Sequence, residues 1–288
     1  MKNILVFTGL ILICFLPDGR AGDLGAAVPG SFYAETIPPR PRDAIGGPAF
    51  ARQTAQMTGA QRQEAALNEL RRGNTPEFLR HLKPVRLSYA PAGKREIRAV
   101  VWVMPDYLAI GSTDDFLRMP LDYWTAIDIA NTWGFILPTR RIVDAIYKQS
   151  PCHLKPDPLP PGPEMRSSAY YLEHRSKIKA QREKAGCALG ELTSGHKKDV
   201  VLSNRLNEKP GRIAIYGWHR QTGKPIQPLS TVHGERYADY SHGVRLVYQT
   251  VWIDEKPRSI LDVLQDPDLA PVLTYEGVLR RLLHMIRL

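Results

Sequence analysis

The residues best suited to chemistry gather in one stretch of the chain, residues 193–245. Four of the eight histidines fall there (His196, His219, His233 and His242), and three of them sit beside a glycine. Imidazole exchanges a proton near neutral pH and binds transition metals. Side chains that must reach a substrate commonly lie at strand ends and on loops over a rigid sheet. The cluster therefore predicts either an active site or a polar ligand groove.

Polar neighbours of these histidines complete the candidate site. They occur in the runs SGHKKD (194–199), YGWH (216–219) and YADYSHGVR (237–245). We expect catalysis to depend on six residues, which are His196, Asp199, His219, Tyr240, Ser241 and His242. We expect the substrate to be bound by four others, which are Lys198, Trp218, His233 and Arg245.

Strand periodicity places two of the histidines at the ends of apolar faces. Side chains two residues apart in a strand share a face. His219 would therefore share a face with Ile213 and Ile215 in a strand over residues 212–219. His242 would share one with Val244 in a strand over residues 240–253. The two imidazoles could meet in a cleft at the rim of the core, or each could be a core histidine bonded to a backbone carbonyl.

A metal-dependent hydrolase is the first chemistry that these residues allow. Zinc is held there by histidines and a carboxylate, and its remaining position activates water. The ligands would be His196, Asp199 and His242. His196 and Asp199 face opposite sides of a regular strand, so they would converge only across a turn or bulge. The sequence thus suggests zinc as a cofactor without fixing that a metal is bound.

Covalent catalysis is a second possibility. Ser241 or Ser194 would act as the nucleophile with a histidine as its base. Ser241 and His242 are adjacent and point apart on a strand, so Ser241 would need a histidine from another strand. The nucleophile-elbow pattern GxSxG is absent from the sequence.

Two further alternatives stay open. In metal-free acid–base catalysis, histidines and Asp199 or Asp239 would move protons while Lys197, Lys198 or Arg245 held an anionic group. The other alternative is a binding or structural domain with a polar groove and no catalysis.

The N-terminus predicts export. Lys2 is followed by an apolar run over residues 4–16, which Pro17 ends, and small residues follow at Ala21 and Gly22. This order is typical of a secretory signal peptide, and the run is shorter than a membrane-spanning helix requires. We expect residues 1–21 to be the signal peptide, with cleavage near Ala21, and the mature protein to be periplasmic or secreted. Cys14 could instead be a lipidation site, but Ile13 before it is too large.

The charge balance bears on the partner. Lys and Arg outnumber Asp and Glu by 39 to 29. Outside the cytoplasm such an excess favours anionic polymers or lipid surfaces, although a basic surface can also serve solubility alone. We find no nucleic-acid recognition motif, and export argues against that partner. After signal cleavage we expect no integral membrane segment.

Cys152 and Cys187 remain once the signal peptide is removed. An even count in an oxidising compartment favours one disulfide, worth roughly 3–4 kcal/mol for a loop of this size. A catalytic thiol is the alternative. The bridge would fix the proline-rich connection over residues 151–163 to the body of the protein.

Periodicity predicts an α+β fold. We expect a proline-rich arm over residues 22–48, then one domain over residues 49–288. Helical patterns cover residues 50–73, 120–133, 140–147, 164–185, 259–264 and 275–287, and strand patterns cover residues 85–89, 97–103, 107–110, 199–202, 212–216 and 240–253. Helices mostly come first and strands later, which favours an antiparallel sheet from the C-terminal half with helices mainly from the N-terminal half.

A second polar patch combines Asp106 and Tyr107 with residues 111–118. Its carboxylates could bind a cation or a sugar hydroxyl, but the ligand spacing of a calcium loop is missing. We interpret it as a solvated turn that caps a helix.

Five segments resemble those of an exported, uncharacterised bacterial protein family. They are PDYLAIGS (105–112), LPTR (137–140), GHKKDVV (195–201), IYGWH (215–219) and DYSHGVRL (239–246). The resemblance covers residues 84–255 and implies no reaction and no residue roles.

The sequence therefore favours an exported hydrolase that uses a histidine-centred site on an extracytoplasmic polymer, such as peptidoglycan or another anionic glycan. The alternative is a non-catalytic domain of the cell envelope that binds such a polymer or another ligand.

Overall fold

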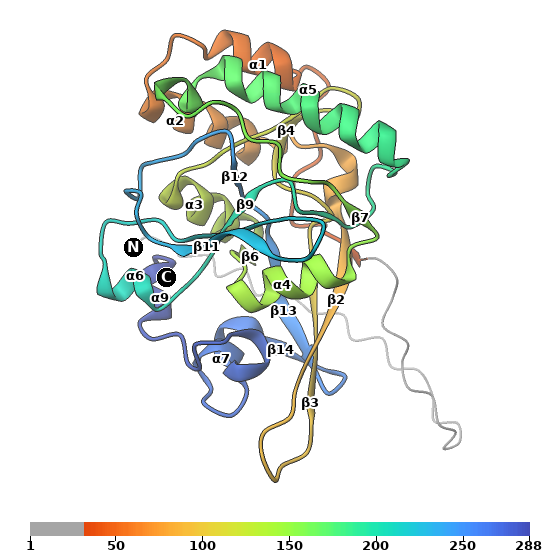
Figure 1. Ribbon diagram of the computed structural model, residues 1–288, viewed down its shortest axis with the longest axis vertical. Helices are drawn as coiled ribbons and strands as arrows, with labels where there is room; N and C mark the ends of the chain where they lie inside the picture. The colour runs from red at the N-terminus through yellow and green to blue at the C-terminus, as the bar shows by residue number, and fades with distance from the viewer. Residues whose placement is uncertain (1–31) are drawn as a thin grey trace, which may run out of the picture.

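Alternating apolar residues build the larger sheet of the computed structural model, which describes residues 32–288 (Figure 1). Leu82, Val85 and Leu87 of one strand and Val101 and Val103 of the next are buried in the core. The strand order is β1 (Phe32–Tyr33), β2 (His81–Tyr89), β3 (Ile97–Val103), β13 (Val247–Ile253) and β14 (Lys256–Ser259), and β6 (Phe135–Ile136) also pairs with β13. All these pairs are antiparallel.

A smaller sheet carries most of the polar residues singled out from the sequence. Its order is β11 (Pro225–Ser230), β10 (Ile215–His219), β9 (Lys198–Val200) and β12 (His242–Gly243). The β9–β12 pair is parallel, and the other two are antiparallel. Two further pairs are β4 (Ala109–Gly111) with β5 (Phe116–Arg118), and β7 (Cys152–His153) with β8 (Thr193–Ser194).

The strand expected over residues 240–253 is wrong in one respect, because the segment divides between the two sheets. β12 pairs with β9, whereas β13 pairs with β3. Between them the carbonyls of Val244 and Leu246 accept from Leu108 N and Met104 N. The backbone stays extended while it changes partners, and periodicity alone does not reveal such a change.

The helices confirm the α+β class. The longer ones are α1 (Gly47–Gln53), α2 (Gly59–Arg71), α3 (Tyr123–Trp133), α4 (Arg140–Gln149) and α5 (Ser168–Ala185). The shorter ones are η1 (Glu77–Arg80), η2 (Pro163–Arg166), α6 (Arg205–Glu208), α7 (Ile260–Gln265), α8 (Ala270–Leu273) and α9 (Leu282–Met285). In Figure 1, α1, α2 and α5 lie at one end of the molecule and the β2–β3 hairpin extends to the other.

Local signals explain several helix boundaries. The Thr139 side chain accepts from Ile142 N and begins α4, as the sequence predicts. Gly134 ends α3 with a φ of 76°, a conformation that suits glycine. The helix expected over residues 275–287 is wrong except for α9, because Leu279 N and Arg280 N donate to Leu264 O and Asn204 Oδ1 instead of to a preceding helical turn.

The predicted disulfide is confirmed: Cys152 is bonded to Cys187. The bridge joins the start of the proline-rich connection to the residue after the C-cap of α5, so the connection is fixed to the domain. The described part of the N-terminal arm also lies on the domain, since Phe32 and Tyr33 pair with β2 and Ala34 and Ile37 are buried. The signal peptide expected at residues 1–21 lies outside the described residues.

None of the helices found among residues 32–288 combines the length and the apolarity that crossing a membrane would require.

Candidate functional site

Three of the predicted histidines face three different aspartates. His196 Nε2 lies 3.1 Å from Asp106 Oδ1, and His219 Nε2 lies 3.3 Å from Asp144 Oδ1. His242 Nε2 lies 3.8 Å from Asp239 Oδ2. The histidines therefore do not form one site, since each lies beside a different carboxylate in different surroundings.

His196 belongs to a buried ion-pair network around Asp106. Arg118 donates to both carboxylate oxygens of Asp106 at 2.9 and 2.6 Å, and Arg182 donates at 2.6 Å. Burial alone would raise the pKa of Asp106, but Arg118 and His196 hold that pKa well below its usual range. Burial lowers the pKa of His196 to about 4. The interpretation of this patch as a solvated turn is wrong for Asp106, which is buried and holds three side chains together, whereas Asp114 lies exposed in the bend between β4 and β5.

Asp199 lies in a second buried network. The Tyr107 hydroxyl donates to its Oδ2 at 2.9 Å, and Arg245 Nε is 4.0 Å from its Oδ1. Burial raises the pKa of Asp199 to about 6. Arg245 is fully buried and donates to the carbonyls of Met104 and Thr193. Arg245 therefore connects strands in the interior, and no part of its side chain reaches the surface where a substrate would arrive.

His219 closes an aromatic cluster on the α4 side of the smaller sheet. Its ring stacks on Tyr147 at 4.5 Å between centroids, and its partner Asp144 also accepts from the Tyr216 hydroxyl at 2.7 Å. The hydrogen bonds from His219 and Tyr216 lower the pKa of Asp144 against the effect of burial. This arrangement couples β10 to α4.

Tyr240 and Trp218 are buried as well. The Tyr240 hydroxyl accepts from Leu159 N at 2.7 Å and so holds the proline-rich connection in place. Trp218 is 6% exposed and lies under the ammonium group of Lys198, 4.9 Å from the ring centroid. Neither aromatic ring is available to stack on a sugar in this conformation.

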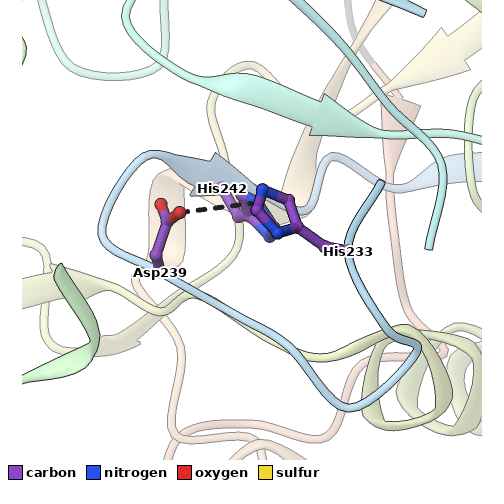
Figure 2. A group of neighbouring side chains, drawn as sticks. All are labelled: His233, Asp239 and His242. Carbon is purple, nitrogen blue, oxygen red and sulfur yellow. Dashed lines mark ion pairs between the residues drawn. The ribbon is translucent and has the colours of Figure 1, made fainter. Parts of the chain in front are cut away.

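One group of side chains has the composition and proximity of a metal site. His233, Asp239 and His242 each offer a ligand atom, and these three atoms lie within 4.8 Å of one another. Figure 2 shows Asp239 pointing toward His242, with the His233 ring beside the His242 ring. His233 and Asp239 come from the loop between β11 and β12, and His242 begins β12.

Backbone hydrogen bonds shape this loop. Tyr237 N donates to Gly234 O, and His242 N donates to Asp239 O, which forms two successive turns. Lys198 N donates to Ser241 O and Ile213 N to His233 O, so β9 and the segment just before β10 hold both ends of the loop. The loop is therefore anchored at the residues that carry the candidate ligands.

Neighbouring side chains orient Asp239. Its Oδ1 accepts from Ser241 twice, from the hydroxyl at 2.5 Å and from the backbone N–H at 2.7 Å. Its Oδ2 accepts from the Tyr237 hydroxyl at 3.1 Å, and the Tyr237 ring stacks on His233 at 4.1 Å between centroids. Partners of this kind are typical of metal-binding carboxylates, whose orientation they fix.

His242 is the residue of this group that most favours a metal site. The side chain is fully buried, and neither ring nitrogen has a hydrogen-bond partner among residues 32–288. The 3.8 Å to Asp239 is too long for a hydrogen bond. A buried polar group without a partner costs about 1–3 kcal/mol. Burial also lowers the pKa of His242 to about 4, so its ring is neutral, as a metal ligand must be, at neutral pH.

The donor set fits zinc in type and number. Catalytic zinc sites use three protein ligands of the histidine and carboxylate kind and leave a fourth position for water. Ligands at about 2.0–2.2 Å from a tetrahedral ion are about 3.4 Å apart. His242 Nε2 and Asp239 Oδ2 are 3.8 Å apart, and all three ligand atoms lie within 4.8 Å of one another, so the side chains would have to move closer to hold the ion.

The sequence named part of this group and missed the rest. It included His242 as catalytic and as a zinc ligand and His233 as substrate-binding, but Asp239 had a role only in the acid–base alternative, and Tyr237 belonged to a polar run without a role of its own. The sequence feature that could have indicated the group is its spacing. Asp239 lies three residues before His242, and His233 lies six residues before Asp239 in a short loop that contains Gly234. The ligands first considered, His196 and Asp199, have other partners in the structure.

The chain matches no protein-family model, and neither the curated proteins nor the solved structures contain a match.

Proposed function

We propose that this protein is an exported, metal-dependent hydrolase of an extracytoplasmic polymer such as peptidoglycan or another anionic glycan, with its centre at His233, Asp239 and His242. The observation that carries the proposal is the buried His242 ring, whose two nitrogens lack partners beside a carboxylate and a second histidine. A divalent transition metal would bind one of these nitrogens together with Asp239 and His233.

Each residue of the site would have a separate role in metal binding or substrate access. A zinc ion on three protein ligands supplies an activated water molecule for hydrolysis. Ser241 and Tyr237 fix the Asp239 carboxylate, so its orientation does not have to be set when a ligand arrives. His233 is only half-buried, so solvent and substrate would approach the centre from its side.

The compartment supports an envelope substrate. The secretory pattern of residues 1–21, the Cys152–Cys187 disulfide and the formal charge of +10 are all compatible with export toward an anionic polymer. These observations favour the substrate class and do not select a bond within it.

The runner-up is a polymer-binding domain in which the metal has a structural role. One observation favours it: Asp239 and His242 are both fully enclosed. Structural metal sites are closed, whereas catalytic sites keep a position for water. The two functions differ in whether the metal-loaded protein releases fragments.

The test is fragment release from insoluble peptidoglycan and from a panel of anionic glycans. We expect the mature protein with zinc to release soluble fragments, a chelator to abolish the release, and added zinc to restore it. His242→Gln should be inactive. His174→Gln is the matched control, since His174 is another buried histidine with an unpartnered Nε2 among the described residues.

Release that is unchanged by the chelator and by His242→Gln would contradict the proposal. Zinc binding without release from any polymer would favour the binding domain.

A further inference from the structure

Lys198 and His242 occupy paired positions on neighbouring strands. The parallel β9–β12 pair aligns Lys198 with His242. Side chains at paired positions project from the same face of a sheet. The ammonium group of Lys198 is therefore on the same side of the sheet as His242. Burial is the main cause that lowers the pKa of His242 and of His233, and the charge of Lys198 lowers both further.

The surroundings of Lys198 hold it in that position without neutralising it. Its ammonium group lies 4.9 Å from the centroid of the Trp218 ring, an attractive cation–π contact. Trp218 has a φ of 54°, which is uncommon for a bulky residue, and strained backbone of this kind clusters at functional sites.

The adjacent lysine has a different role. Lys197 is buried, and its ammonium group donates to the carbonyl of Tyr240. Lys198 is only half-buried and has no hydrogen-bonded carboxylate among the described contacts. Of the two lysines, Lys198 is the one that can present its charge to a ligand at the site.

A second cation lies beside Tyr237. The Arg166 guanidinium is 5.4 Å from the centroid of the Tyr237 ring, and Tyr237 stacks on His233. Arg166 is exposed. With a divalent metal in place, the single negative charge of Asp239 would be outweighed by the metal, Lys198 and Arg166, and an anion would be attracted to the site.

We propose that this site takes an oxyanion, the phosphate or carboxylate group of an anionic polymer, and that Lys198 binds that group while Trp218 positions Lys198. The proposal rests on the metal centre of the proposed function and adds the class of group that the centre accepts. The positive charge of Lys198 would repel a metal cation bound to the neighbouring ligands. A cation at this position is explained if Lys198 binds an anion at the site.

The competing explanation is that Lys198 itself serves as the cation for Asp239, in place of a metal. The two explanations predict opposite responses to loss of the lysine charge. If Lys198 binds the anion, its removal weakens anion binding and leaves zinc binding equal or tighter, because a like charge is gone. If Lys198 is a structural counterion, its removal disturbs the carboxylate and weakens both.

The experiment measures zinc affinity and then the affinity of the zinc-loaded protein for inorganic phosphate and for acetate by calorimetry. The variants are Lys198→Met and, as a matched control, Lys256→Met on the exposed strand β14. For Lys198→Met we expect equal or tighter zinc binding and an affinity for the preferred anion lower by about tenfold to a hundredfold, the value of one hydrogen bond to a charged group. Lys256→Met should match the wild type.

Preference for phosphate or for acetate identifies the source of the group, and either supports the proposal. Weaker binding of both zinc and anion in Lys198→Met, or unchanged anion binding, would overturn it while leaving the metal centre intact. A wild-type protein that binds no zinc would instead reject the proposed function.

Discussion

Ser241 donates twice to one oxygen of Asp239, through its hydroxyl at 2.5 Å and its backbone N–H at 2.7 Å. The serine expected from the sequence to act as a nucleophile is thus held on a carboxylate, with its hydroxyl occupied. Because the same carboxylate faces His242 and Tyr237, Ser241 sets the direction in which Asp239 meets the candidate metal.

Loss of the Ser241 hydroxyl should weaken metal binding. Residues that orient metal ligands typically contribute about tenfold to a hundredfold to affinity. We expect Ser241→Ala to bind zinc about tenfold to a hundredfold more weakly, measured by competition with a chelator of known affinity. Ser194→Ala is the control, since Ser194 is buried and its hydroxyl is unpartnered within residues 32–288. Equal losses in both variants would mean that Ser241 acts on stability alone.

The Asp106 network should matter for stability and leave the metal site intact. Removal of one partner from a buried ion pair leaves an uncompensated charge and costs about 3–5 kcal/mol. We expect Asp106→Asn to lower the free energy of unfolding by about this amount, because Arg118 and Arg182 both lose their carboxylate. Zinc affinity of the folded variant should equal that of the wild type. A specific loss of zinc binding would place His196 back in the functional site.

Lys197 should make stability depend on pH in the alkaline range. Burial lowers the pKa of Lys197 to about 7, whereas lysine in an unfolded chain titrates near 10.5. Between these values the unfolded chain binds the proton more readily, so stability falls as the pH drops from about 10.5 to about 7. Lys197→Met should remove this pH dependence and raise the free energy of unfolding near pH 7 by on the order of 3–5 kcal/mol. Loss of the hydrogen bond to Tyr240 would reduce this gain. Chemical unfolding at several pH values measures this pH dependence, and Lys209→Met, at an exposed lysine, is the reference. Parallel pH profiles of the free energy of unfolding for wild type and Lys197→Met would refute the prediction.

The disulfide should carry a measurable part of the stability. Cys152 and Cys187 are 35 residues apart, and closing a loop of this size is worth roughly 3–4 kcal/mol. We expect the double variant Cys152→Ser, Cys187→Ser to lose about that much free energy of unfolding, and each single variant to lose a similar amount. Wild-type protein treated with a reductant should match the double variant. Single losses that add up to far more than the double loss would indicate separate roles for the two thiols.

Local signals in the sequence were enough to predict much of the fold. Thr139 begins α4 and Gly134 ends α3 because each satisfies a helix end through its own side chain or conformation. Strand β3 follows directly from its apolar run. The prediction of the last helix failed because its backbone N–H groups donate to Asn204 and Leu264, which lie outside the segment.

The site was only partly predictable because its composition depends on long-range contacts. His196 and His242 look equivalent in the sequence, each beside a glycine in a polar run. Their difference arises from Asp106, which is 90 residues from His196 and bonds its Nε2, whereas no residue among 32–288 bonds either ring nitrogen of His242. The Asp239–His242 spacing was visible, but its meaning required knowing which histidines already had partners.

The measurement that tests the account most directly is the zinc stoichiometry of the metal-free protein after titration. We predict one equivalent bound by the wild type and by His174→Gln, and none at that affinity by His242→Gln or Asp239→Asn, with all four proteins folded. Zinc binding that is absent from the wild type, or that survives in His242→Gln, would contradict the assignment of His233, Asp239 and His242 as a metal centre.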